Sequence, residues 1–309
     1  MRKLMLAGVL VLVLTGIAFG QPYRQFELPK FTEPPILDGD RFSVTGEWAN
    51  TAGPFECSPE AIEADAEQFG WLDQATKNTV VSHDQLGTSE SEDGAIALTN
   101  LDKKADMWFA WDDEALYMIH EVRDNSRDSR TDGNPEAWWE RDSVSIYIDL
   151  TEANEESSPY VSLNIVNMVA APITASGLTV TWERTEAGAR SPTQEPDLIA
   201  DIDYGFRDAG DEFGGGEDYV IEGTIPWTTI MMFNLPAAPE PGTIMGWSII
   251  HLDPDIDPGY GGQLQCLGHA DNPITFADWL FSDRPAGPGS PGATAVEDNS
   301  WGRIKSTFN

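Results

Sequence analysis

The sequence predicts an all-β protein: an antiparallel β-sandwich of the jelly-roll type, with a long insertion in its N-terminal half and one or two short helices. Two observations predict this class. Many short segments alternate apolar and polar residues between Gly, Pro, Asn or Asp, which is typical of strands joined by turns. The chain also lacks the β-α-β rhythm of α/β proteins and has no G-x-G-x-x-G or phosphate-binding loop motif.

Eight segments carry the strand pattern, all rich in β-branched or aromatic residues. In chain order they are Trp108–Trp111, Ala115–Val122, Ser143–Asp149, Tyr160–Val169, Leu178–Thr185, Tyr219–Ile225, Ile244–Leu252 and Trp301–Lys305. The alternation is clearest in Ser143–Asp149, where Val144, Ile146 and Ile148 share one side. Period two with one apolar face predicts a half-buried strand whose polar face, with Ser145 and Tyr147, meets solvent.

Helix signals are few. Ser58-Pro59-Glu60 has the order of an N-cap, a first-turn proline and an early acid, and this helix is expected to end at Gly70. Pro226 is expected to begin a second, short helix that runs through Phe233. Residues 51–105 are long and polar with little strand pattern, and are interpreted as an insertion at the rim of a single domain, 21–309. Residues 284–294 are interpreted as a loop.

The N-terminus has the order of a secretory signal peptide. Arg2 and Lys3 precede the apolar run Leu4–Ile17, and Ala18-Phe19-Gly20 offers a small-x-small cleavage site. A membrane anchor is the alternative, but the run is shorter than the roughly 20 residues that a span needs. We therefore expect residues 1–20 to be removed and the protein to be secreted, periplasmic or at the cell surface, without insertion into a membrane.

The chain is strongly acidic. Its formal charge is −34, and loss of Arg2 and Lys3 takes it to −36. Such a field repels nucleic acid and anionic membranes, so neither is an expected partner. Solubility, adaptation to a salty habitat and binding of divalent cations all remain compatible with this charge. Two cysteines remain, Cys57 and Cys266, and in an exported chain a pair is more typical of a disulfide than of a metal site.

Six landmarks follow one another along the chain. They are Ile36-Leu37-Asp38-Gly39 with Gly46-Glu47-Trp48; Trp111–Tyr117 running to Val122 and Asp124; Trp139–Asp149; Tyr219–Glu222 with Ile225-Pro226-Trp227; Gly246 with Asp253 and Asp255; and Trp301-Gly302-Arg303-Ile304. In this order they resemble the family 9 carbohydrate-binding modules. That superfamily of β-sandwiches also contains haem-binding domains of the DOMON type. The resemblance covers most of residues 34–305 apart from the insertion.

The resemblance implies that Trp139 stacks on a sugar, because family members place a tryptophan before this strand. An indole buries apolar C–H faces of a pyranose while polar neighbours bind its hydroxyls. Ser145, Tyr147 and Asn164 are the expected polar partners. Ser145 stands where family members carry a glutamate, and Asn164 lies near the position of their arginine. Residues 281–299 contain no tryptophan, so the second stacking ring of the family is absent.

Calcium is the expected ion, because family members often bind it structurally and it prefers six to eight oxygen ligands. The candidate ligands form two clusters, Asp124, Asp128 and Asp132 in one and Asp253, Asp255 and Asp257 in the other. The second is not an EF-hand, because Leu264 stands at position twelve. Solvated turn residues are the alternative interpretation.

Haem is the rival cofactor that the superfamily suggests. Its candidate ligands are Met118, His120, Met168, His251 and His269. Met118 and His120 are two apart on one expected strand and therefore face the same way. There is no Cys-x-x-Cys-His for covalent attachment, and a lone Met or His on an apolar face is usually part of a core. Haem is therefore not the expected cofactor.

Catalysis has little support. The histidines lack zinc-ligand spacing and no Gly-x-Ser-x-Gly is present, while 52 acids offer carboxylate pairs without selecting one. The sequence therefore predicts an exported, non-catalytic protein that binds a plant, algal or microbial polysaccharide or glycan, with calcium-stabilised loops, serving polysaccharide breakdown. The alternatives are a haem electron-transfer domain and a calcium-dependent surface protein. The sequence leaves open the glycan, the partner enzymes and the oligomeric state.

Overall fold

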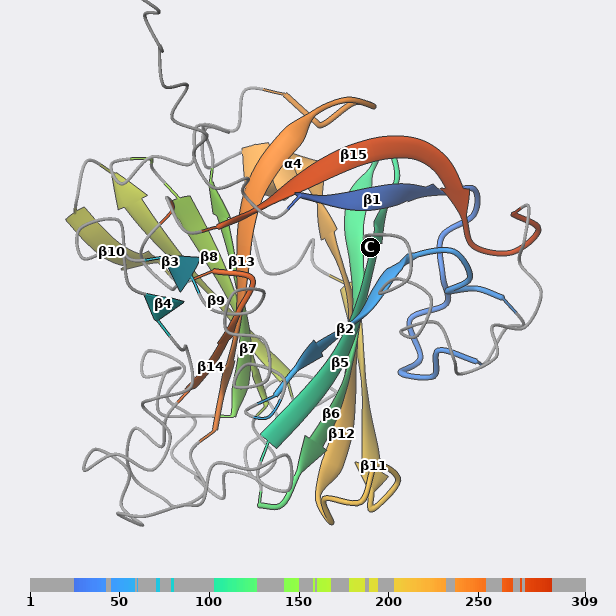
Figure 1. Ribbon diagram of the computed structural model, residues 1–309, viewed down its shortest axis with the longest axis vertical. Helices are drawn as coiled ribbons and strands as arrows, with labels where there is room; N and C mark the ends of the chain where they lie inside the picture. The colour runs from blue at the N-terminus through green and yellow to red at the C-terminus, as the bar shows by residue number, and fades with distance from the viewer. Residues whose placement is uncertain are drawn as a thin grey trace, which may run out of the picture.

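The computed structural model describes residues 25–42, 46–58, 71–72, 79–80, 103–126, 142–149, 160–167, 178–186, 189–193, 203–231, 237–253, 263–268 and 276–290, with residues 60, 158 and 273. It is an all-β sandwich, as predicted (Figure 1). The elements are β1 (Gln25–Phe31), β2 (Ala52–Cys57), β3 (Trp71–Leu72), β4 (Thr79–Val80), β5 (Lys103–Trp111), β6 (Ala115–Asp124), β7 (Ser143–Asp149), β8 (Tyr160–Asn167), β9 (Leu178–Glu186), β10 (Ala189–Thr193), β11 (Asp203–Gly210), β12 (Asp218–Pro226), α4 (Trp227–Met231), β13 (Ile244–Leu252), β14 (Gln263–Cys266) and β15 (Ala277–Ala286).

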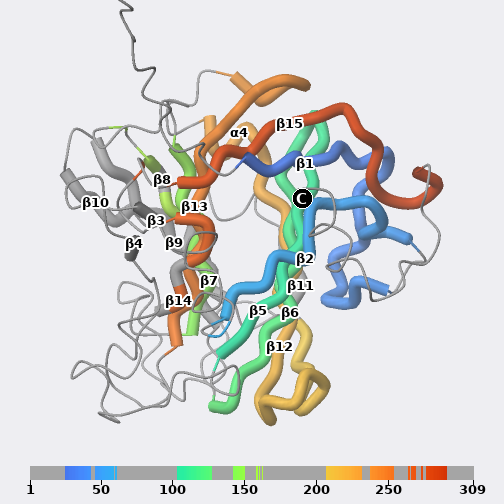
Figure 2. The backbone as a smooth tube through the Cα atoms, viewed as in Figure 1, coloured from blue at the N-terminus to red at the C-terminus, as the bar shows by residue number. Residues whose placement is uncertain are grey.

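One curled sheet forms both layers. Its order is β10-β9-β8-β7-β13-β15-β1-β5-β6-β12-β11, with β14 on β13 and β2 on β5. One layer contains β10, β9, β8, β7 and β13, and the other contains β5, β6, β12 and β11. β15 and β1 run side by side across the top and join the two layers (Figures 1 and 2). In the described part of the chain, no helix has the length and hydrophobicity to cross a membrane.

The antiparallel prediction is wrong for β1, which pairs in parallel with both β15 and β5. The strand was also missed in the sequence, and Pro29 explains why. Proline cannot donate to a sheet ladder, and it lies where the β1–β15 register shifts between Leu28 and Lys30. β1 thus connects the two layers despite a residue that usually argues against a strand.

Seven predicted strands are present, and Ser143–Asp149 and Ile244–Leu252 have the expected bounds.

Residues 51–105 differ from the expected insertion at both ends, because Ala52–Cys57 is β2 and β5 begins at Lys103. Arg284–Ala286, expected in a loop, belongs to β15, where hydrogen bonds to β1 hold it extended. The short helix after Pro226 is confirmed as α4. The signal peptide, the 58–70 helix beyond Glu60 and the 301–305 strand lie outside the described residues.

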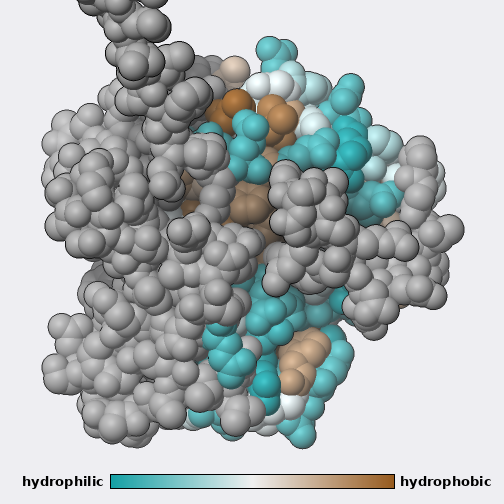
Figure 3. Space-filling view, in the orientation of Figure 1, coloured by the Kyte–Doolittle hydropathy of each residue, from teal (hydrophilic) through white to brown (hydrophobic). Residues whose placement is uncertain are grey.

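The core between the layers is apolar and aromatic at its centre. Val144, Ile146 and Ile148 point into it, as the alternation predicts. The indoles of Trp247 and Trp279 stack with ring centroids 5.0 Å apart. On the face shown in Figure 3, hydrophilic residues dominate the described surface and hydrophobic ones appear mainly in its upper middle part.

A disulfide joins the two layers. Cys57 at the end of β2 is bonded to Cys266 at the end of β14, with Cα atoms 5.8 Å apart and a sequence separation of 209. β2 lies on β5 in one layer, and β14 lies on β13 in the other. Both cysteines are buried, so the bond crosses the sandwich interior.

Glu222 of β12 binds the N-terminal segment, by which we mean the residues between β1 and β2, on the side of the β5-β6-β12-β11 layer that faces away from the core. One carboxylate oxygen accepts the backbone N–H groups of Asp38 and Gly39, each at 2.9 Å, and the other accepts the Trp48 indole N–H at 2.8 Å. Gly39 has φ +76°, and a Cβ there would lie 2.7 Å from Arg207 Cβ, so only glycine fits this turn. Two landmarks that are distant in sequence therefore meet at one carboxylate.

Burial raises the pKa of Glu222 from its ordinary value to about 7, although the hydrogen bonds oppose this. The folded state therefore binds a proton more tightly than the unfolded state. This stabilisation is full below about pH 4.5 and is lost as the pH rises through about 7. In urea unfolding series, the stability advantage of the wild type over Glu222→Gln should grow as the pH falls from 8 to 5. An advantage that is constant with pH contradicts this, and Glu240→Gln, which changes an exposed acid, is the matched control.

Candidate functional site

The polar side of β7 is buried, which corrects the expected solvent-exposed face. The side chains of Ser145 and Tyr147 are 0% and 1% exposed. The Tyr147 ring lies 5.7 Å from the Tyr160 ring and 6.4 Å from the Phe276 ring, measured between centroids. Phe276 comes from a segment 129 residues further along the chain, so the alternation within β7 could not show that this face is covered.

Two hydroxyls on this buried face retain hydrogen-bonding capacity. The Ser145 and Ser248 hydroxyl oxygens have no hydrogen-bond partner among the described residues. Ser145 pairs in register with Asn164 of β8 and with Ile250 of β13, and Ser248 pairs with Tyr147. The backbone thus places the expected partners Ser145, Tyr147 and Asn164 on adjacent strands. Trp139 and the Asn164 side chain lie outside what the structure describes.

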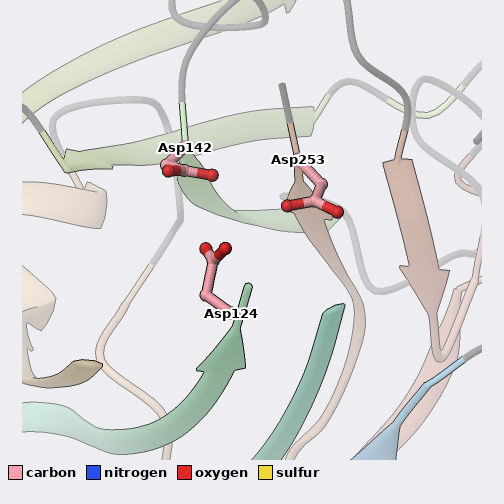
Figure 4. Close-up of side chains that lie close together, drawn as sticks. All are labelled: Asp124, Asp142 and Asp253. Atoms are coloured by element: carbon pink, nitrogen blue, oxygen red, sulfur yellow. The ribbon is translucent and has the colours of Figure 1, made fainter. Parts of the chain in front are cut away.

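Three carboxylates converge at the end of the sandwich where the acidic loops begin (Figure 4). Asp124 ends β6, Asp142 immediately precedes β7, and Asp253 immediately follows β13. All three are buried, and one oxygen from each lies within 4.8 Å of the others. We call this set the acidic cluster. Asp128, Asp132, Asp255 and Asp257 follow these strand ends in the sequence and lie outside the described residues.

The acidic cluster unites residues that the sequence placed in two separate groups. Asp124 and Asp253 were assigned to different calcium clusters, yet the fold brings their carboxylates together. Asp142 was missed as a ligand candidate, although its place directly before the strand pattern of β7 was a usable signal. Asp218 stabilises the backbone at Asp124, because its carboxylate accepts hydrogen bonds from the backbone N–H groups of Asp124 and Gly215, each at 3.1 Å.

A lysine fills the centre of the acidic cluster. Lys103 Nζ lies 2.6 Å from Asp124 Oδ2, 3.0 Å from Asp142 Oδ1 and 3.2 Å from Asp253 Oδ1. Its side chain is 0% exposed, and Nζ lies 5.1 Å from the Tyr219 ring centroid. Burial alone would lower the pKa of Lys103, but the Asp124 and Asp142 carboxylates outweigh it and hold this pKa well above its ordinary value. The lysine is therefore a charged ammonium. No pattern in the neighbouring sequence predicted that Lys103 would be the charged centre of the acidic cluster.

The acidic cluster as described does not fit calcium between its three carboxylates. Calcium binds oxygen at about 2.3–2.6 Å, so an ion shared by all three would take the space of Lys103 Nζ. Of the predicted calcium ligands, Asp124 and Asp253 are paired with Lys103 instead, and the remaining candidates are Asp128, Asp132, Asp255 and Asp257.

Two histidines named as haem ligands meet inside the core. His120 Nδ1 of β6 lies 3.3 Å from His251 Nε2 of β13, and the Phe109 ring lies 5.5 Å from the His120 ring. This direct contact leaves no space for a porphyrin between the two imidazoles. Met118 shares the core-facing side of β6 with His120, so these two cannot ligate opposite faces of one haem. Met168 and His269 lie outside the described residues.

Burial lowers the pKa of His120 to about 3 and holds that of His251 well below its ordinary value. Both imidazoles are therefore neutral in the fold, and their contribution to stability is lost as the pH falls below about 6.5. In urea unfolding at pH 7 and pH 5, the double variant His120→Leu/His251→Leu should lose less stability on acidification than the wild type. Equal losses in the two proteins would contradict this account.

Comparison with known proteins places these features in a family. The profile of the family described as "Carbohydrate family 9 binding domain-like" matches residues 73–264, well over half of the chain. The matched region includes the acidic cluster, Lys103 and the Trp139 position. No curated protein matches the chain.

Two solved structures of a family 9 carbohydrate-binding module from Caldicellulosiruptor kristjanssonii are similar to this chain. The one in complex with glucose has 16% identity and a TM-score of 0.46, covering 84% of this chain and 97% of that one. The one in complex with cellotriose has 15% identity and a TM-score of 0.46, covering 89% of this chain and all of that one.

Proposed function

The chain belongs to the carbohydrate family 9 binding domain-like family, and from this premise we propose that it binds a polysaccharide or glycan on Trp139 without acting on it chemically. The family match over residues 73–264 is the observation that carries the proposal. An exposed indole suits a pyranose, because its flat face covers the apolar C–H groups of the ring. Trp139 precedes β7 in the sequence, where the resemblance to the family implies a stacking tryptophan.

The base of the segment that carries Trp139 supports this role. The segment leaves the sheet at Asp124 and returns at Asp142, and both carboxylates contact the same buried ammonium of Lys103. Binding sites gain precision when their residues stand on rigid elements. The two ends of the Trp139 segment are thus held on the sheet by one ion-paired centre.

The polar partners take different roles once burial is considered. Tyr147 is packed beneath Phe276 and Tyr160, so it supports the sheet and does not contact the sugar. Asn164 is the partner proposed to bind sugar hydroxyls. Ser145 pairs directly with Asn164 across β7 and β8, but it is fully buried, so it too supports the sheet and does not contact the sugar.

The described acids support a role in binding and not in hydrolysis. Glycosidases need two carboxyl groups that face the scissile bond, one of them with a raised pKa. The acidic cluster is buried and ion-paired with Lys103. Two described carboxyl groups outside the cluster have a raised pKa: Glu222, which is buried beneath the segment between β1 and β2, and Asp106, which is ion-paired with Lys104. The acidic cluster and Glu222 are too deeply buried to reach a polysaccharide.

Export and calcium complete the proposal. The 1–20 segment would direct the chain out of the cytoplasm, and there it would serve polysaccharide breakdown beside the enzymes that carry it out. Calcium would be held by the loop carboxylates Asp128, Asp132, Asp255 and Asp257, whose hard oxygen ligands suit it. There it would order the loops and take no part in chemistry.

Affinity electrophoresis through gels that contain plant, algal or microbial polysaccharides tests the proposal. We expect retardation in at least one gel, reduced when a chelator removes calcium from the loops. An unretarded protein in every gel, together with no depletion from solution by insoluble polysaccharides, would contradict the proposed function.

A further inference from the structure

The acidic cluster already contains a cation of its own. The Lys103 ammonium donates hydrogen bonds to Asp124 and Asp142, and its Nζ is also ion-paired with an Asp253 oxygen at 3.2 Å. We propose that this ammonium is the resident cation of the cluster, held where a divalent metal ion would otherwise bind, and that its removal exposes a latent divalent-cation site formed by Asp124, Asp142 and Asp253.

The position of the ammonium is fixed by the fold. Lys103 is the first residue of β5 and pairs directly with Asp124 of β6. Its side chain points into the sandwich end, with the Tyr219 ring 5.1 Å from Nζ. Asp142 and Asp253 belong to the opposite layer, directly beside the ends of the neighbouring strands β7 and β13. The ammonium therefore joins the two layers as well as the three strand ends.

Charge explains why the site is latent and not merely absent. Three buried carboxylates lie within 3.2 Å of one ammonium. Like charges in a buried site are costly unless a cation compensates them. Replacing Lys103 leaves the three carboxylates around the space that Nζ occupied, and carboxylate oxygens are the ligands that calcium prefers. The space and the ligands then suit a small divalent ion.

This inference does not depend on sugar binding, and it differs from the calcium proposed for the loop carboxylates. Any loop calcium stabilises the wild type and a Lys103 variant alike. Only a variant that lacks the ammonium gains a site at the strand ends. The difference between the two proteins, not the calcium response of either one, carries the test.

The test compares thermal unfolding of the wild type, Lys103→Met and Lys104→Met, each with calcium and with EDTA. Lys104 is the matched control, because it is the next residue but pairs with Glu56 and Asp106 at a partly exposed site. In EDTA, Lys103→Met should unfold about 10 °C lower than the wild type. Calcium should then raise its midpoint by several degrees more than it raises those of the wild type and Lys104→Met. Adding Asp142→Asn to Lys103→Met should remove this extra response.

Two results would overturn the proposal. One is a folded Lys103→Met whose midpoint responds to calcium no more than that of the wild type. The other comes from calcium titration of the wild type and Asp142→Asn by calorimetry. If the wild type binds one more calcium ion than Asp142→Asn, a metal ion and not Lys103 is the resident cation. This second measurement decides the matter even where Lys103→Met does not fold, and equal stoichiometries support the proposal.

Discussion

Replacing Cys57 and Cys266 together with alanine is expected to lower the free energy of unfolding by about 5 kcal/mol, the largest single effect we predict. The disulfide closes a loop of 209 residues, so its loss frees a long stretch of the unfolded chain. It also joins β2 in one layer to β14 in the other, which no other covalent link between described residues does.

Equilibrium unfolding in guanidinium chloride measures this loss, with the wild type in reducing and non-reducing buffer as the companion comparison. Reduction of the wild type should reproduce most of the effect of the double variant. A change below about 1 kcal/mol in both comparisons would show that packing between the layers, and not the covalent link, holds the sandwich closed.

Trp139→Ala is expected to weaken glycan binding by about 2 kcal/mol or more, roughly 30-fold in Kd, while the fold is unchanged. The large effect follows because the chain lacks the second stacking tryptophan in residues 281–299, so one indole carries the apolar contact. Isothermal titration with a soluble glycan measures the ratio of the two affinities.

Phe42→Ala is the matched control for Trp139→Ala. Phe42 is 67% exposed and is the one exposed large aromatic side chain among the described residues. It stacks on the Arg41 guanidinium in the N-terminal segment, far in sequence from β7. Its loss should leave the affinity unchanged. Equal weakening by both variants would point to general adhesion through exposed rings.

The fold was predictable where alternation is strong and local. β7 has the predicted bounds because β-branched and polar residues alternate through its whole length, and β13 because a run rich in Ile and Trp lies between the turn residues Gly242 and Pro254. β1 and β10 were missed because each contains a proline, Pro29 and Pro192, which argues against a strand when partners are unknown. Their pairing with β15 and β9 outweighs that local preference.

The site was predictable in its parts and not in its assembly. Asp124 and Asp253 were identified by residue type, but 129 residues separate them and only the sheet order brings their strands to one end of the sandwich. Lys103 was not identified, because two adjacent lysines, Lys103 and Lys104, before a strand pattern look like a solvated strand end. The buried face at Ser145 was missed for a related reason: Phe276, which covers its neighbour Tyr147, is distant in sequence.

Binding of the mature chain and of Trp139→Ala to one broad glycan array tests the central claim most directly. The account predicts that the wild type binds a restricted group of polysaccharides or their oligosaccharides, and that Trp139→Ala loses the same spots while its far-ultraviolet circular dichroism is unchanged. An array without any bound glycan, or one on which both proteins give the same pattern at the same strength, would contradict it.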